Sequence, residues 1–132
     1  MDNMIKKSPS GALSPYYYKG GYFHGIHYGS YFDKDDTLLS MMSEEEDFIL
    51  KSPERRRILI DLYETNISAS LTIKIMEHIE KIKSRIVKLA IASDKKSLCQ
   101  LRKAIMKKKI LGTGQIYFST DMEEAKTWLV SD

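Results

Sequence analysis

The stretch that decides the fold runs from Arg57 to Ser70 and reads RILIDLYETNISAS. Its first half, Ile58 to Leu62, is a short apolar run between a basic cluster and a polar loop, which is typical of a strand buried on both faces. A strand of this kind lies in the middle of a sheet and is covered by other elements. The sequence therefore predicts that the rest of the chain packs around Ile58 to Leu62.

The composition is that of a soluble globular protein. The chain has 132 residues, of which 42% are hydrophobic and 30% are charged, and no apolar run approaches the roughly 18 residues that a membrane helix needs. Residues 1–15 hold two prolines, a glycine and three serines, so we expect a mobile N-terminal segment there. Residues 16–132 are predicted to form a single α/β domain.

Charge and cysteine content limit which cellular compartment and which classes of partner are expected. Cys99 is the only cysteine, which excludes an intrachain disulfide and a thiolate metal cluster and fits a reducing cytoplasm. No continuous apolar region follows Lys6 and Lys7, so no export signal is predicted. The net charge of +3 does not favour a nucleic-acid partner. The basic runs at 55–57 and 107–109 are interpreted as solvated charge rather than anion sites.

The N-terminal part of the domain is rich in tyrosine and glycine. Gly20 and Gly21 predict a two-residue turn that joins a strand at 16–19 to a strand at 22–28 as an antiparallel hairpin. His24 and His27 are three apart on a strand and should point to opposite faces, which argues against a metal site. The tyrosines could stack on bases, but this segment lacks the basic surroundings that such a platform needs.

Helices and strands then alternate along the chain. Residues 33–51 predict a helix whose run from Glu44 to Asp47 faces solvent, and Ser43 with Glu46 matches a capping box at which the helix could break. Later elements follow from apolar spacing and caps. They are a helix at 70–84, a strand at 86–92, a helix from Ser93-Asp94 to about Lys109, a strand at 116–119, and a last helix capped by Thr120 or Asp121.

This order predicts an α/β fold with a mostly parallel, four- to five-stranded sheet, an N-terminal antiparallel hairpin strand and flanking helices. The loops at the carboxyl ends of the parallel strands are the expected functional positions. These loops are 64–70, 93–96 and 119–121. In the last helix, Trp128 is expected to be largely buried beside Ala125 and Leu129. Cys99 is expected to be a small packing residue at the flank of its helix.

Several of these residues together resemble the STAS superfamily, in particular its SpoIIAA-like branch, whose founding members are anti-sigma factor antagonists. Phe118 followed by Glu124-Ala125 and Trp128-Leu129 is similar to the closing strand and helix of that family, and Ile60-Asp61-Leu62 is similar to its central strand. The similarity is best from Arg57 to Val130. It implies a small regulatory domain that binds a protein partner.

The chain departs from this family in the loop after the central strand. The antagonists carry an Asp-Ser-Ser/Thr-Gly motif there, with the phosphorylated hydroxyl in it, whereas residues 66–71 read NISASL. The resemblance therefore leaves Ser70, and less closely Ser68, as the candidate phospho-acceptor or anion-binding residues. Both serines also fit a helix N-cap. The SpoIIAA-like branch shares a gross resemblance with lipid-binding Sec14-type domains.

No enzyme signature is found. The sequence lacks a glycine-rich phosphate loop, a nucleophile elbow and zinc-ligand spacing, and Gly112-x-Gly114 is not followed directly by a helix. Asp61 has no paired acidic residues from an earlier strand end to hold the Mg²⁺ of a receiver domain. We therefore predict no catalytic residue, metal or cofactor. The predicted function is a non-enzymatic cytoplasmic regulatory or protein-interaction domain, and the alternative is a small-ligand carrier for a lipid or other amphiphile.

Overall fold

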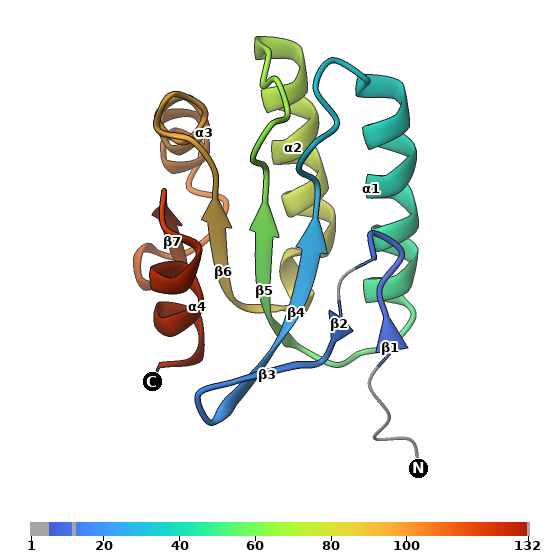
Figure 1. Cartoon of the computed structure of the whole chain (residues 1–132), viewed down its shortest axis with the longest axis vertical. Coiled ribbons are helices and arrows are strands. Elements are labelled where there is room, and N and C mark those ends of the chain that lie inside the picture. Colours follow the sequence, from blue (N-terminus) through green and yellow to red (C-terminus); the bar gives the residue numbers. More distant parts are fainter. Residues whose placement is uncertain (1–5, 12, 132) are drawn as a thin grey trace.

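The computed structural model describes residues 6–11 and 13–131 and shows the predicted α/β fold (Figure 1). A five-stranded sheet has the order β3-β4-β5-β6-β7. Its strands are β3 (Tyr16–Tyr18), β4 (Gly21–His27), β5 (Arg56–Asp61), β6 (Ile86–Ala92) and β7 (Ile116–Ser119). β3 and β4 are antiparallel, whereas β4 to β7 are parallel. The predicted central position of the Ile58 to Leu62 run is confirmed.

Four helices of the described structure flank this sheet, three on one face and one on the other (Figure 1). They are α1 (Asp35–Leu50), α2 (Ala69–Ile82), α3 (Lys95–Lys108) and α4 (Met122–Val130). Because β4 to β7 add in one direction, right-handed crossovers place α1, α2 and α3 together on one face. The chain after β7 then folds back, so that α4 lies on the opposite face. Short 3₁₀ turns at Lys83–Arg85 and Thr113–Gln115 precede β6 and β7.

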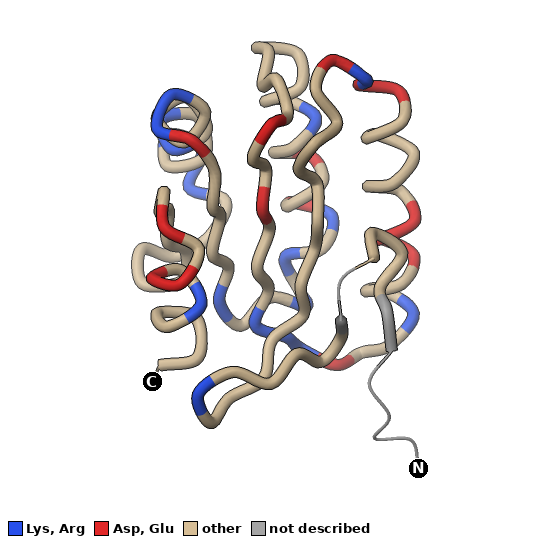
Figure 2. Tube along the Cα trace, in the orientation of Figure 1, with Lys and Arg blue, Asp and Glu red and all other residues tan. Residues whose placement is uncertain are grey.

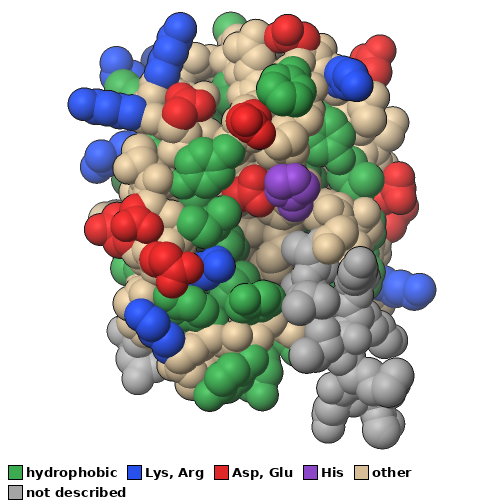
Figure 3. Space-filling model, in the orientation of Figure 1, with side chains coloured by type: hydrophobic (Ala, Val, Ile, Leu, Met, Phe, Trp, Pro, Cys, Tyr) green, Lys and Arg blue, Asp and Glu red, His purple; other side chains and the backbone are tan. Residues whose placement is uncertain are grey.

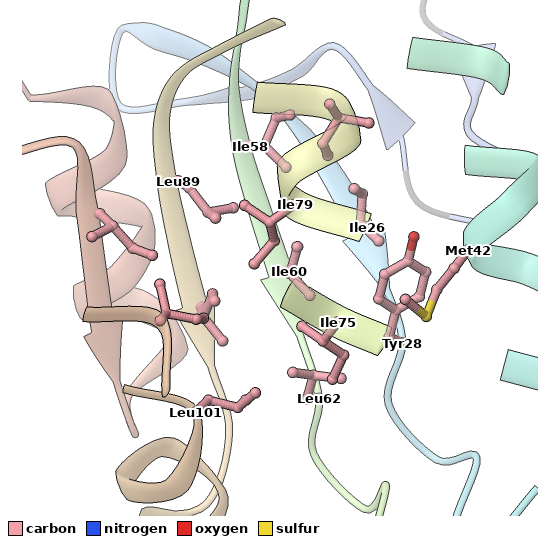
Figure 4. Close-up of a cluster of buried hydrophobic side chains, with 14 of the residues drawn as sticks. Ile26, Tyr28, Met42, Ile58, Ile60, Leu62, Ile75, Ile79, Leu89 and Leu101 are labelled. Atoms are coloured by element: carbon pink, nitrogen blue, oxygen red, sulfur yellow. The ribbon is translucent and has the colours of Figure 1, made fainter. Parts of the chain in front are cut away.

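Two apolar clusters form the core, one on each face of the sheet. Alternate residues of β5 point to the two sides, so that Ile58 and Ile60 lie in the larger cluster and Leu59 lies in the smaller one. The larger cluster fills the space between the sheet and α1 to α3, where Ile75 and Ile79 of α2 meet β5 (Figure 4). The smaller cluster lies under α4. The expectation of a strand buried on both faces is confirmed.

The hairpin turn lies one residue earlier than predicted. Tyr18 pairs with Gly21, so the two turn residues are Lys19 and Gly20, with φ values of 45° and 88°. Positive φ at both central residues is the geometry whose twist matches that of the flanking strands. On the hairpin, Tyr17 and Tyr22 are exposed and lie 5.1 Å apart between ring centroids.

The acidic run of α1 faces solvent only in part, because Glu44 and Asp47 are exposed whereas Glu45 is not. Glu45 is fully buried and accepts a hydrogen bond from His24 Nε2 at 3.0 Å, which leaves His24 Nδ1 to accept from the Ser14 hydroxyl at 2.6 Å. Burial alone would raise the pKa of Glu45, but hydrogen bonds from His24 and Ser10 outweigh it and hold that pKa below its usual value. The helix also continues through Ser43 without a break.

The described part of the N-terminal segment lies against the outer edge of β4. Its two short strands, β1 (Lys6–Lys7) and β2 (Leu13–Ser14), pair with each other. The Ser8 hydroxyl donates to the Gly25 carbonyl at 3.2 Å, and the His27 amide donates to the Ser10 hydroxyl at 2.9 Å. Side-chain hydroxyls thus satisfy backbone groups of β4 that no strand pairs. Residues 1–5 and 12, which also belong to the segment predicted to be mobile, lie outside the described residues.

Of two single-residue expectations, one is met in part and one is wrong. Trp128 is partly buried: it packs against the smaller cluster, and its ring stacks on Tyr117 with centroids 5.1 Å apart. The Lys88 ammonium lies 4.1 Å from the centre of the same ring. Cys99 is exposed on α3 and does not pack in the core.

The basic run after α1 has a structural role that the sequence did not reveal. The Arg57 guanidinium donates to the carbonyl oxygens of Leu129 and Ser131 at 2.7 Å each, and Arg55 donates to the Ile86 carbonyl at 2.9 Å. These bonds tie the start of β5 to the end of α4 and to the start of β6. The interpretation of this run as solvated charge is therefore incomplete.

Candidate functional site

The candidate site lies at the carboxyl edge of the parallel strands, where the loops after β4 and β5 run side by side. The Ser30 amide donates to the Tyr63 carbonyl at 2.7 Å, and the Phe32 amide donates to the Glu64 carbonyl at 2.9 Å. These bonds extend the parallel pairing of β4 and β5 beyond the strands themselves. The two loops therefore form one connected surface.

Thr65 fastens this pair of loops from inside. Its buried hydroxyl donates to the Tyr28 carbonyl at 2.6 Å and accepts from the Tyr31 amide at 3.1 Å. Close approach of the loops also requires glycine at Gly29, since a Cβ there would lie 2.5 Å from Asp61 Oδ1. Gly29 is thus a site where the neighbouring loop approaches the backbone closely.

Three non-glycine residues of these loops have left-handed backbone conformations. The φ values are 65° for Ser30, 52° for Phe32 and 61° for Glu64. Each such conformation costs free energy, of the order of 1 kcal/mol, and persists only where the surrounding contacts enforce it. Such residues are found preferentially at functional sites. This concentration on two adjacent loops marks the carboxyl edge as the first place to look for function.

A groove of about 900 Å³ opens between these loops and the start of α3. It is lined by Phe32, Asp33, residues 64–69, Asp94, Lys96, Ser97 and Gln100. Asn66 closes one end, where its side-chain amide donates to Asp33 Oδ1 at 2.7 Å. Three carboxylates line the groove against one ammonium group, so its charge does not favour a free anion.

Of the two serines predicted from the family resemblance, Ser68 is the N-cap of α2. Its hydroxyl accepts from the Leu71 amide at 3.0 Å, which satisfies one of the unpaired amides of the helix start. Ser70 is the second residue of the helix and is exposed. Within the described part of the chain, its hydroxyl makes no hydrogen bond. The two serines are thus brought together at one helix start, but only Ser70 has a free hydroxyl.

The start of α3 forms the facing wall of the groove. Asp94 caps this helix by accepting from the Ser97 amide at 2.8 Å, and this backbone hydrogen bond lowers the pKa of Asp94. The predicted cap at Ser93-Asp94 is confirmed. The Gln100 side chain crosses to α2 and donates to the Thr72 hydroxyl at 2.8 Å, which fixes the two helix starts relative to each other.

Two exposed apolar side chains belong to this region, and sequence reasoning missed both. Phe32 lines the groove and is 55% exposed, and Ile73 on α2 is 54% exposed. Ser70 and Ile73 are three residues apart on one helix and therefore share a face. The sequence does indicate the exposure of Ile73, because this residue lies off the apolar stripe of Leu71 and Ile75. Phe32 carried no comparable signal, since its exposure depends on the backbone of its loop.

His27 and Asp61 are joined by a hydrogen bond on the other face of the sheet. His27 Nδ1 lies 2.8 Å from Asp61 Oδ2, and half of the His27 side chain is exposed. His24 points to the helix face, so the predicted opposite orientation of the two histidines is confirmed. Among the side chains of the described residues, no group of three His, Cys, Asp or Glu could hold a metal ion.

A third histidine lies in the core between β4, α1 and α2. His78 Nδ1 donates to Glu46 Oε2 at 2.6 Å, and His78 Nε2 accepts from the Tyr28 hydroxyl at 2.7 Å. Burial lowers the pKa of His78 and raises the pKa of Tyr28. A neutral imidazole satisfies both neighbours. Both His78 and Tyr28 are 1% exposed, so this chain of hydrogen bonds joins elements of the fold and is not open to a substrate.

Comparisons of the chain with protein-family models, with curated proteins and with solved structures found no match. In the part of the chain that the structure describes, no helix is both long and apolar enough to cross a membrane.

Proposed function

We propose that this protein is a non-enzymatic regulatory domain that docks a protein partner on the carboxyl-edge groove and the exposed face of α2. The observation that carries the proposal is the placement of Ser70. Its free hydroxyl lies directly after the groove residues Ser68 and Ala69, and one helical turn before the exposed Ile73. A modifiable group and an apolar contact thus share one surface.

Phosphorylation of Ser70 would act on this surface through charge. A phosphoryl group adds about −1.5 to −2 charge at neutral pH and is favoured at the positive end of a helix. The first turn of α2 contains no acidic residue that would repel it. The modified helix start would then present a strongly anionic group to a partner that packs on Ile73. This is the kind of switch implied by the resemblance to SpoIIAA-like antagonists, and we propose that it operates in the cytoplasm.

The test is recovery of partners from a lysate of the source organism by five forms of the protein. These are wild type, Ser70→Asp, Ser70→Ala, Ile73→Glu and the control Tyr22→Ser, which removes a similarly exposed ring at the far end of the molecule. We expect a partner that wild type and Tyr22→Ser retain equally, that Ile73→Glu loses, and that the two Ser70 variants bind to different extents. Phosphopeptide mapping of residues 66–74 completes the test.

Two results would overturn the proposal. One is equal recovery of every partner by all five forms together with no phosphopeptide in that range. The other is loss of the partner by Tyr22→Ser with retention by Ile73→Glu, which would move the docking surface to the hairpin.

A carrier for a small amphiphile is the second candidate, and one hollow supports it. A space of about 320 Å³ on the face beside α4 is lined by Phe23, Leu59 and Met122, with Asp61 and Lys126 also bordering it. Hydrophobic side chains gather on this face of the molecule (Figure 3). The volume lies at the lower end of the range for ligand sites, roughly 300 to 1,000 Å³. A native mass spectrum tests this second candidate. A carrier would retain a small molecule, and Leu59→Trp, which fills the hollow, would release it.

A further inference from the structure

Helix α3 carries an unbalanced positive charge. Its sequence KKSLCQLRKAIMKK holds six basic residues and no acidic one, and Lys and Arg colour much of the helix in Figure 2. None of the ion pairs among the described residues involves a cation of α3. Neighbouring like charges on a helix are mildly destabilising. The chain has a small net charge, yet six of its basic residues lie on this one helix and form no ion pair with the described residues.

Strand β7 forms an edge of the sheet directly beside this helix. β6 is its only strand neighbour in the described structure. The Ser119 carbonyl accepts from Ser93 and so faces inward, and by the alternation along a strand the backbone of Phe118 faces outward. The opposite side of the sheet differs, because β3 pairs with the first part of β4, and Ser8 and Ser10 bond outer backbone groups of its remaining part. An uncovered edge is a template for another strand.

A groove of about 720 Å³ runs between α3 and β7. Its apolar lining includes Leu98, Met106 and Phe118, and its charged lining includes Lys95, Arg102 and Lys103 from α3. The carboxylate of Glu124 also borders the groove, but it accepts a hydrogen bond from the Ser119 hydroxyl at 2.6 Å. The groove therefore combines an apolar floor, a cationic wall and an open strand edge.

We propose that an extended acidic segment of a partner protein binds in this groove by adding a strand to the open edge of β7. Main-chain hydrogen bonds to β7 would hold it, and its carboxylates, at alternate positions on one face of the added strand, would face the cations of α3. The apolar side chains between them would point to the opposite face, beside Tyr117, whose ring stacks on Trp128 of α4. Lys95 and Arg102 are two helical turns apart, about 10.5 Å along the axis. Acidic residues at alternate positions of an extended chain, at about 3.3 Å per residue, span that length.

The structure disfavours three other occupants of this groove: an anionic membrane, a nucleic acid and a second copy of the chain. The apolar side of α3, Leu98, Leu101 and Ile105, is buried against the sheet, so this helix has no apolar face to insert into a membrane. Phe118, the aromatic ring that lines the groove, packs against the core and offers no stacking platform for bases. A second copy of the chain paired through β7 would bring two cationic α3 helices together. This surface is also distinct from the one proposed around Ser70, so the two proposals can fail separately.

The probe is a fluorescent peptide with alternating acidic and valine residues, Glu-Val-Asp-Val-Glu-Val-Asp, followed by anisotropy. We expect binding that weakens with added salt, and Arg102→Glu with Lys103→Glu should weaken it by about tenfold or more. Both residues are exposed, so the fold is preserved. The matched control, Lys51→Glu with Lys74→Glu, changes the net charge equally outside the groove and should alter affinity by less than about twofold.

Strand addition is separated from simple charge attraction by a second peptide in which prolines replace the valines. Proline has no backbone N–H to donate, so this peptide should bind at least about tenfold more weakly. Cys99 lines the groove and is the only cysteine, so the bound valine peptide should slow its alkylation by iodoacetamide severalfold.

The proposal is overturned if the proline peptide binds as well as the valine peptide, or if Cys99 is not protected. It is overturned equally if single-stranded RNA or phosphatidylserine vesicles bind more tightly than the peptide. Dimerisation of the peptide-free protein that Arg102→Glu with Lys103→Glu abolishes would assign the surface to a second copy of the chain.

Discussion

Among the described residues, the sheet face under α1, α2 and α3 holds a cluster of twenty buried side chains, whereas the face under α4 holds a cluster of six. The difference follows from the topology, because strands that add in one direction send every crossover helix to the same side. The free energy of folding is therefore concentrated on the helix face. The shallower face leaves the His27–Asp61 pair and a ligand-sized hollow open to solvent. Mutations can test how far the two faces differ.

The largest effect is expected from Ile79→Ala in the larger cluster. Ile79 is fully buried, and removal of its side chain should cost about 4 kcal/mol and lower Tm by more than about 10 °C. Ile73→Ala on the same helix is the matched control, because Ile73 is 54% exposed and its loss should change stability by less than about 0.5 kcal/mol. Urea denaturation of both variants measures the difference. Equal losses would mean that α2 does not pack as described.

The next largest effect concerns Glu45, the buried carboxylate of the helix face. Glu45→Ala leaves His24 and the Ser10 amide without their acceptor and should cost about 3 kcal/mol. The neighbouring Glu44→Ala is the control, because Glu44 is exposed. The same denaturation experiment applies, and a Glu45→Ala variant as stable as Glu44→Ala would show that Glu45 faces solvent after all.

On the sheet face under α4, truncation of the smaller Leu129 should reduce stability more than truncation of the larger Trp128. Trp128 is only partly buried and Leu129 is fully buried on the same helix. We expect Trp128→Ala to cost about 2 kcal/mol and Leu129→Ala about 3 kcal/mol. Trp128 fluorescence reports unfolding of the leucine variant, and circular dichroism reports both. The reverse order would mean that Trp128 contributes more to the packing under α4 than Leu129 does.

The smallest effect is a pH dependence from the buried His78. Burial lowers the pKa of His78 below its usual value of 6.5, so as pH falls through 6.5 the unfolded chain binds a proton that the folded chain does not. Stability from this group is complete above pH 6.5 and is lost below it. The contribution of Glu45, whose pKa is lowered from 4.5, is lost only at more acid pH. Tm measured from pH 7 to 5 should fall, and His78→Gln should flatten that slope, while an unchanged slope would assign it to other groups.

Much of the fold was readable because apolar spacing and caps are local signals. The strand Ile116–Ser119, the caps Asp94 and Asp121, and the central position of Ile58 to Leu62 all agree with the structure. Glu45 was not readable, because an acidic run gives no sign of a histidine that a distant strand brings to it. The partial exposure of Trp128 was not readable either, because its ring lies on Tyr117 of β7, a contact that no local pattern shows.

The sequence predicted where a functional site should lie, but not which residues line the groove found there. The sequence placed function at the carboxyl ends of the strands and named Ser68 and Ser70, which lie together at the start of α2. It could not foresee that Phe32 and Asp33 line the same groove, because the parallel pairing of two loops brings them there. The basic groove was missed because no local pattern shows that β7 ends the sheet beside α3.

The one-directional strand order also bears on how the chain folds. Each parallel strand pairs with a neighbour only about thirty residues away in the chain, and no strand has to enter between two others that are already joined. We expect the sheet to grow outward from β5 and β6, while the N-terminal segment, although synthesised first, docks late because Ser10 needs Glu45 in place. Pulse-labelled hydrogen exchange should protect the amides of β5 and β6 before those of Ser10 and His27, and simultaneous protection would refute this sequence of events.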